Sequence, residues 1–291
     1  MAVTVDLFRD FAQLIRDELN IDSSRDDLDV VRLFAWYDLR RLPMQNWNVH
    51  YSRELQENHF FINNKSYIEA IRNKAESGED LVPHASHRVD DITEKDELLA
   101  DWGIYHIHPG HGTRPRKSGF VDGAAELLFV LPRGKDLYFI DVLDHKSWTN
   151  FSLIEVIDNN WPFLLDPFRL KNVVGLSNEP TEEDLYKLRK NQINAFFRVG
   201  KSFFIGPGGG LASDGSASRA VLMSMNLKKL LDGYSKQLKE EEADFRRTVE
   251  ERTETPLNVD TISLKLLQYD PRTGSGEIYE PSTATVIQFH F

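Results

Sequence analysis

The chain has 291 residues, of which 41% are hydrophobic and 28% charged, as is typical of a folded globular protein with one large domain or two small ones. It contains no cysteine, so disulfides and thiolate chemistry are excluded and any metal site must use His, Asp or Glu. The formal net charge of −11 argues against broad, nonspecific affinity for nucleic acid, but it permits a local basic cleft.

The chain lacks the signals of membrane insertion and export. No apolar run approaches the ~20 residues that a membrane-spanning helix needs. The first residues become acidic at once and lack the basic-then-apolar order of a signal peptide. We therefore expect no membrane association and a cytoplasmic location.

The N-terminal region is expected to be mainly helical. Apolar spacing predicts helices over residues 4–19, 26–42 and 65–75 and a short strand over 47–51. Residues 82–95 are polar and rich in turn formers, which predicts a long ordered loop.

A β-hairpin is predicted in the middle of the chain. Residues 126–131 form an uninterrupted apolar run, residues 132–135 have the composition of a turn, and residues 137–143 provide a partner strand. Alternating polarity over residues 103–108 predicts a further strand just before them. These segments together predict a central, mainly antiparallel sheet.

The C-terminal part is expected to mix helices and strands. Capping patterns and apolar spacing predict helices over residues 152–161, 181–194 and 227–252, and strands within 195–205, at 220–225, at 261–269 and at 283–291. The glycine-rich residues 206–218 lack the Gly-Lys-Ser/Thr ending of a phosphate-binding loop, so a mobile loop is favoured over an anion site or a lid.

The expected fold class is α+β, with a helical N-terminal region, a central antiparallel sheet, and a C-terminal long helix with a small sheet. Residues 1–170 would hold the helical region and a His-bearing α+β domain. Residues 171–291 would form a C-terminal α+β region with the glycine-rich loop and the long helix. No linker divides the chain clearly, so the boundary is placed near 165–180 and a single domain is the alternative.

Titratable side chains concentrate between residues 98 and 148. His106, His108 and His111 fall within six residues, and His145 follows the second hairpin strand. Since residues i and i+2 of a strand share a face, the first two imidazoles should point together toward a cleft, with Tyr105 and Ile107 on the core. A structural role is the commoner fate of any single histidine in a strand, so the cluster rather than one residue suggests a site.

One chemistry fits this cluster without a metal. Cleavage of RNA by its own 2′-hydroxyl requires a base, an acid for the leaving 5′-oxygen, and positive charge for the phosphorane. Histidines near neutral pKa can serve as base and acid, while Arg or Lys supplies the charge. The candidate catalytic residues are His106, His108, His145, Lys146 and Arg116, and the candidate substrate-binding residues are Arg114, Lys117, Tyr138 and Trp148. Two alternatives remain open at this point.

The first alternative is a single-metal hydrolase. The spacing H-x-H-x-x-H is a credible metal-ligand pattern, so His106, His108 and His111 or His145 could hold a divalent ion such as zinc or manganese. The pattern resembles the H-x-H-x-D-H motif of metallo-β-lactamase-type enzymes, but Gly110 stands where that motif has its aspartate. The second alternative is a non-enzymatic binding or regulatory protein whose histidines are structural.

A longer resemblance favours the ribonuclease. The stretch Leu-Leu-Ala-Asp-Trp-Gly-Ile-Tyr-His-Ile-His over 98–108, with Asp-His-Lys-Ser-Trp over 144–148, resembles bacterial proteins of uncharacterised function that share D-W-G-I-x-H-x-H-x-G. The strand order and the His/basic pairing are similar to the RelE and barnase–EndoU–colicin RNase toxins. The resemblance implies a bacterial cytoplasmic toxin or phage-defence effector with RNA as substrate and no cofactor. It further implies that His106 and His108 are the paired catalytic histidines, with Lys146 or Arg116 as the charged stabiliser. An antitoxin or inhibitor protein, or a second copy of the chain, would be the partner.

Overall fold

The structure is a computed structural model that describes residues 2–114, 117–123, 125–254, 256–257 and 260–290. The chain divides into two compact units. Met1–Ala35 with Ala220–Phe291 form what we call the terminal unit, and Trp36–Arg219 form the central unit. Residues 165–180, where a boundary was expected, lie inside the central unit.

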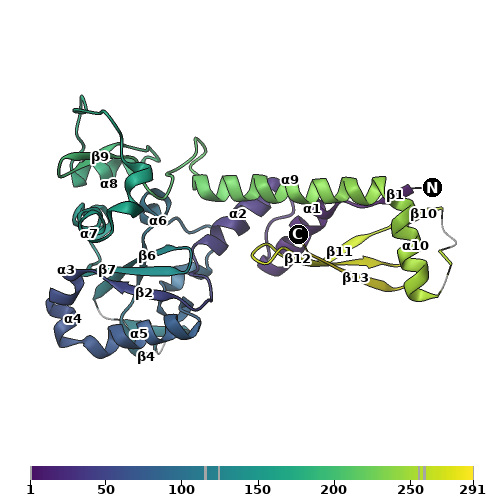
Figure 1. The fold of residues 1–291 in the computed structure, drawn as a ribbon, viewed down its shortest axis with the longest axis horizontal. Helices are drawn as coiled ribbons and strands as arrows, with labels where there is room; N and C mark the ends of the chain where they lie inside the picture. Colours follow the sequence, from purple (N-terminus) through teal and green to yellow (C-terminus); the bar gives the residue numbers. More distant parts are fainter. Residues whose placement is uncertain (1, 115–116, 124, 255, 258–259, 291) are drawn as a thin grey trace. The chain divides into compact units, whose positions relative to one another are not determined.

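A four-stranded sheet organises the central unit, in the order β2-β7-β6-β3 (Figure 1). The long hairpin of β6 (Glu126–Arg133) and β7 (Asp136–Asp144) is antiparallel, as predicted. β3 (Tyr105–Ile107) joins β6 antiparallel, and only β2 (Asn48–Tyr51) runs parallel to its neighbour β7. The expected mainly antiparallel central sheet is confirmed.

Helices cover both faces of this sheet. Leu127, Phe129 and Leu131 of β6 point to one face and pack against α7 (Ser152–Asn160). Leu128 and Val130 point to the other face and pack against α5 (Lys65–Ser77) (Figure 1). A strand that is buried on both faces reads as a continuous apolar run instead of an alternating one. This explains the unbroken apolar sequence of β6.

Shorter elements complete the central unit. They are α3 (Arg53–Glu57), α4 (His59–Asn63), η1 (Val82–His84), η2 (His87–Asp90), α6 (Glu97–Trp102), β4 (Gly110–Arg114), β5 (Lys117–Gly123), η3 (Ser147–Thr149), η4 (Pro162–Leu164), η5 (Asp166–Phe168), α8 (Glu182–Lys190), β8 (Phe197–Val199) and β9 (Ser202–Phe204). The predicted capping box is present at α8, where Thr181 and Asp184 cap each other's backbone N–H groups.

The terminal unit joins the two ends of the chain. Its elements are β1 (Ala2–Thr4), α1 (Leu7–Leu19), α2 (Asp27–Leu39, which continues into the central unit), α9 (Ser218–Glu240), α10 (Glu242–Thr253), β10 (Thr261–Ser263), β11 (Lys265–Asp270), β12 (Ser275–Glu280) and β13 (Thr285–His290). β1 pairs parallel with β10, and the last three strands form an antiparallel sheet. The long helix and small sheet expected at the C-terminal end are confirmed.

Two details of the terminal unit correct the sequence predictions. Residues 220–225, expected as a strand, belong to α9, because Ala, Leu and Met favour a helix and Val221 alone is β-branched. The single helix expected over 227–252 is two helices that meet at Glu241.

Across the described ranges, none of the helices combines the length and apolar content that a bilayer span requires.

Candidate functional site

A pocket of about 570 Å³ opens in the central unit, a size within the range of small-molecule sites. Its wall comes from the end of α2, the ordered loop at 82–97, strand β3, the turn after β7, and α8. We call it the His pocket, because His87, His106, His108 and His145 line it together with Trp148. The sequence predicted four of these as site residues, namely His106, His108, His145 and Trp148, and they lie around one cavity.

His106 occupies the middle of β3, opposite Phe129 of β6. Tyr105 and Ile107 turn to the other face and enter the core, as the alternation predicted. The imidazole of His106 meets the Trp148 indole edge-on, with ring centroids 4.5 Å apart. The strand therefore presents His106 to the pocket against an aromatic wall.

His108 follows the end of β3 and is tied to a residue that the sequence did not single out. Its backbone N–H donates to the His84 carbonyl over 2.6 Å, and His84 Nδ1 donates back to the His108 carbonyl over 3.0 Å. His84 Nε2 therefore accepts, from Lys74 Nζ at 3.3 Å. The His108 ring, held in this way, lies 5.5 Å between centroids from the ring of His145, which is exposed at the rim.

Asp96 faces His106 from the start of α6. One of its carboxylate oxygens accepts the Leu99 N–H over 2.9 Å and caps the helix, while the other lies 3.6 Å from His106 Nδ1. Burial lowers the pKa of His106, Asp96 opposes that shift, and His145 adds to it. His106 is therefore neutral at neutral pH, with a carboxylate just beyond hydrogen-bond distance of its Nδ1.

The lowered pKa of His106 predicts a pH dependence of stability. The unfolded chain takes up a proton on this side chain as the pH falls below about 6.5, whereas the folded chain takes it up only at a lower pH. The free energy of unfolding should therefore fall with decreasing pH, and less steeply in His106→Gln. Urea unfolding of both proteins at about pH 7.5 and about pH 5 measures the difference. Parallel losses of stability would contradict the prediction.

Arg189, which lines the pocket, belongs to a buried ion pair. Arg189 of α8 and Asp101 of α6 are 5% and 6% exposed, and Arg189 Nε donates to the Asp101 carboxylate over 2.8 Å. Arg189 Nη1 donates to the Trp148 carbonyl, and the guanidinium lies 4.3 Å over the Trp102 ring centroid. Burial raises the pKa of Asp101, which the charge of Arg189 opposes. This pair fixes Trp148 and was missed because its members are 88 residues apart in sequence.

Arg40 holds the loop that forms the opposite wall. It is 6% exposed and donates to the backbone carbonyls of Arg88 and Asp91. The loop over residues 82–95 is thus ordered, as predicted, by a side chain that lies outside it.

The glycine-rich segment docks on α6 in a way that the sequence did not indicate. Gly208 N–H donates to the Asp101 carbonyl over 2.7 Å, and Gly210 N–H donates to the Ala100 carbonyl over 2.9 Å. These bonds satisfy carbonyls at the C-terminal end of a helix, which lack partners within the helix. The first part of residues 206–218 therefore holds the C-terminal end of α6.

The charge of the pocket is opposite to that of the chain. Six basic side chains line it, against three carboxylates, although the chain carries −11 overall. The basic residues are Arg40, Arg41, Arg88, Lys95, Arg189 and Lys190, and the acidic ones are Glu94, Asp96 and Glu97. Four of the six basic side chains are in ion pairs, which are Arg41–Asp90, Arg88–Glu94, Arg189–Asp101 and Lys190–Glu97. The positive excess of the pocket is therefore small.

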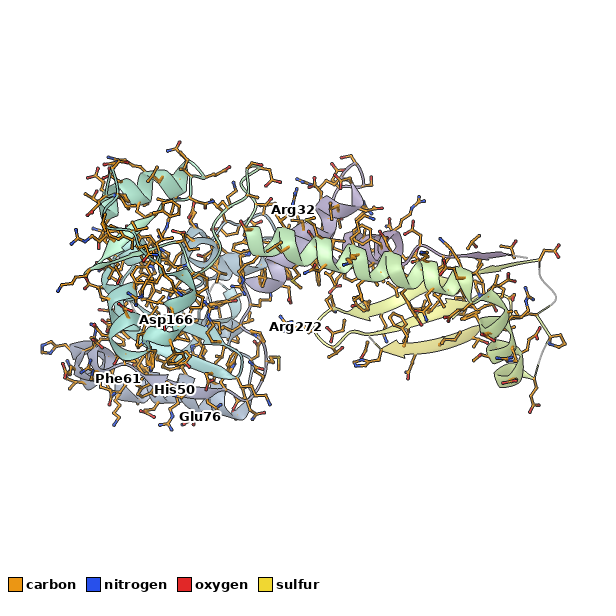
Figure 2. The ribbon with its side chains drawn as sticks, turned by 45° about the horizontal axis from the view of Figure 1, so that its top comes forward. Arg32, His50, Phe61, Glu76, Asp166 and Arg272 are labelled. Atoms are coloured by element: carbon orange, nitrogen blue, oxygen red, sulfur yellow. The ribbon has the colours of Figure 1, made fainter. Side chains whose placement is uncertain are left out.

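Other predicted site residues lie elsewhere. Lys146 is exposed and does not line the pocket. Tyr138 lies toward the opposite end of β7, where it stacks on His50, labelled in Figure 2, with ring centroids 4.9 Å apart. Arg116 is outside the described residues, and so are the side chains of His111, Arg114 and Lys117.

A metal site does not emerge from the described side chains. No three of their His, Asp or Glu groups are arranged to hold an ion. His106, His108 and His145, one of the two predicted ligand sets, belong to the described side chains and are not so arranged. The other set depends on the His111 side chain, which falls outside them. The metal hydrolase therefore stays a prediction.

No protein-family model matches the chain, and neither a curated protein nor a solved structure matches it. Function must be argued from the pocket itself.

Proposed function

We propose that the central unit is a metal-independent endoribonuclease whose active site is the His pocket. The observation that carries the proposal is the meeting of His106, His108, His145 and Trp148 in one basic cavity. Neutral and protonated imidazoles are the acid–base pair that RNA self-cleavage needs near neutral pH. Basic side chains of the lining supply the positive charge that the phosphorane needs.

The roles follow from the environment of each side chain. Neutral His106 accepts the 2′-hydroxyl proton while Asp96 stabilises the imidazolium that forms. The 2′-oxygen bonds to phosphorus, the P–O5′ bond breaks, and His145, exposed at the rim, acts as the acid that gives a proton to the leaving oxygen. The products are a 2′,3′-cyclic phosphate and a 5′-hydroxyl, so every proton and electron pair is accounted for.

Removal of the imidazoles tests the proposal. His106→Ala and His145→Ala should each lower the rate of RNA cleavage by about 10²–10⁴-fold, because an acid or base contributes that much. His108→Ala, which removes the ring beside that of His145, should lower the rate as well. Cleavage is followed on a labelled single-stranded RNA in the presence of a chelator, with the cyclic phosphate end identified by mass spectrometry. An oligonucleotide with a single 2′-deoxy substitution should resist cleavage at that position.

His50→Ala is the matched control. His50 lies in the same unit and pairs with Asp136 at 2.8 Å, but it does not line the pocket, so this variant should cleave normally. Full activity of His106→Ala would overturn the proposal. Activity that requires added zinc or manganese would favour the metal hydrolase instead.

The biological role proposed with this activity is that of a bacterial cytoplasmic toxin or phage-defence effector. Expression of the chain should then arrest bacterial growth, and His106→Ala should relieve the arrest. An antitoxin or inhibitor protein that covers the pocket, or a second copy of the chain, is the proposed partner. Equal toxicity of the variant would contradict a role through RNA cleavage.

A further inference from the structure

Arg189 presents an unused donor at the His pocket. Its Nε and Nη1 are engaged by Asp101 and by the Trp148 carbonyl, but Nη2 has no hydrogen-bond acceptor among the described residues. A buried donor without an acceptor is costly, more so when it is charged. The side chain is 5% exposed and lines the cavity, so a ligand there can supply the missing acceptor.

The lining charges favour an anion near Arg189, because Glu94 is paired with Arg88 and Asp96 is directed at His106. Asp101 balances the charge of Arg189, and Glu97 forms an ion pair with Lys190 at 3.0 Å. Lys95 is exposed. Arg40 adds a second buried guanidinium to the lining. A planar guanidinium is matched by the oxygens of phosphate, to which it donates strong charge-assisted bonds.

An aromatic surface adjoins this donor. The carbonyl of Trp148 accepts from Arg189, and its indole lines the same cavity with His106 against it. Bases stack on such rings once they are unpaired, whereas a duplex hides them. A cavity of about 570 Å³ suits one nucleotide-sized group rather than a helix.

We infer that the His pocket contains a phosphate-binding subsite at Arg189, next to Trp148, and that it takes a single unstacked nucleotide of a nucleic acid strand. The inference deepens the proposed function, on which it rests for the choice of RNA as the source of that nucleotide. The subsite itself binds phosphate esters whether or not the chain cleaves them.

Calorimetric titration of the full chain with three probes tests the subsite. The probes are nucleoside 3′-monophosphates, the corresponding nucleosides, and inorganic phosphate. The monophosphates should bind about tenfold or more tightly than either part, because they engage Arg189 and Trp148 together. Nucleosides that bind as tightly as the monophosphates would overturn the inference.

Arg189→Lys and Arg133→Lys form a matched pair of variants. Arg133 also leaves a terminal nitrogen without an acceptor among the described residues, but it does not line the pocket. Arg189→Lys should weaken monophosphate binding about tenfold or more and leave nucleoside binding unchanged, whereas Arg133→Lys should alter neither. Equal effects of the two variants, or none from Arg189→Lys, would overturn the inference.

A measurement on the unaltered chain covers the case in which Arg189→Lys fails to fold. Arginine side-chain NMR should show the Arg189 guanidinium resonances shifting as a nucleoside 3′-monophosphate is added, with those of Arg133 unmoved. Unmoved Arg189 resonances at saturating monophosphate would overturn the subsite. Monophosphate binding without RNA cleavage would keep the subsite and remove the ribonuclease, while cleavage unaffected by Arg189→Lys would do the reverse.

Discussion

Asp101→Ala is expected to lower the free energy of unfolding of the central unit by about 3–5 kcal/mol. The change leaves the guanidinium of Arg189, which is 5% exposed, without its carboxylate in a poorly solvated site. An uncompensated buried charge is far more costly than the loss of an exposed pair. Urea unfolding followed by tryptophan fluorescence reports on this unit alone, since all five tryptophans lie between residues 36 and 219.

Glu97→Ala provides the control for Asp101→Ala. Glu97 pairs with Lys190 across the same two helices, α6 and α8, but on the surface, where an ion pair contributes about 0–1 kcal/mol. The double change Asp101→Ala/Arg189→Met should recover part of the lost stability, because it removes the unpaired charge. A single Asp101→Ala variant as stable as Glu97→Ala would show that the buried pair does not hold α8 to α6.

The parts of the site that could be predicted from the sequence are those encoded locally. The alternation around His106 and the apolar run of β6 specify strands. Because β7 pairs antiparallel with β6, the end of β7 and His145 lie near the start of β6, which pairs with the strand of His106. Trp148 follows only three residues later. These residues could therefore be predicted to lie together because they belong to neighbouring segments of the chain.

The parts that could not be predicted depend on packing between distant segments. Arg189 and Asp101 lie on helices whose mutual position no local pattern encodes, and Arg40 acts on a loop about 50 residues away. A single polar residue in a helix gives no periodic signal that separates a buried partner from a solvated one. The basic character of the pocket was hidden for the same reason, within a chain of net charge −11.

Gly208→Ala is expected to destabilise the central unit by about 2–3 kcal/mol, through overpacking. An added Cβ would lie 2.5 Å from Gly103 N and 2.6 Å from the carbonyl oxygens of Ala100 and Leu99, all of them backbone atoms. Backbone cannot rotate away as a long side chain can, so the segment must leave the end of α6. The Gly208 bond to the Asp101 carbonyl is then lost, and the tryptophan-detected unfolding midpoint should fall.

Gly175→Ala is the control, because it shows whether replacing any glycine of this unit by alanine lowers its stability. Nothing lies within 4 Å of a Cβ added at Gly175 of the same unit, so this variant should be neutral or gain up to about 1 kcal/mol from reduced entropy of the unfolded chain. Gly208→Ala should also weaken monophosphate binding, because α6 carries both Asp101, which fixes Arg189, and the Asp96 cap that faces His106. If Gly208→Ala unfolds at the same urea concentration as Gly175→Ala, the segment does not support α6. If it loses stability but keeps monophosphate affinity, the segment stabilises the unit without positioning the pocket.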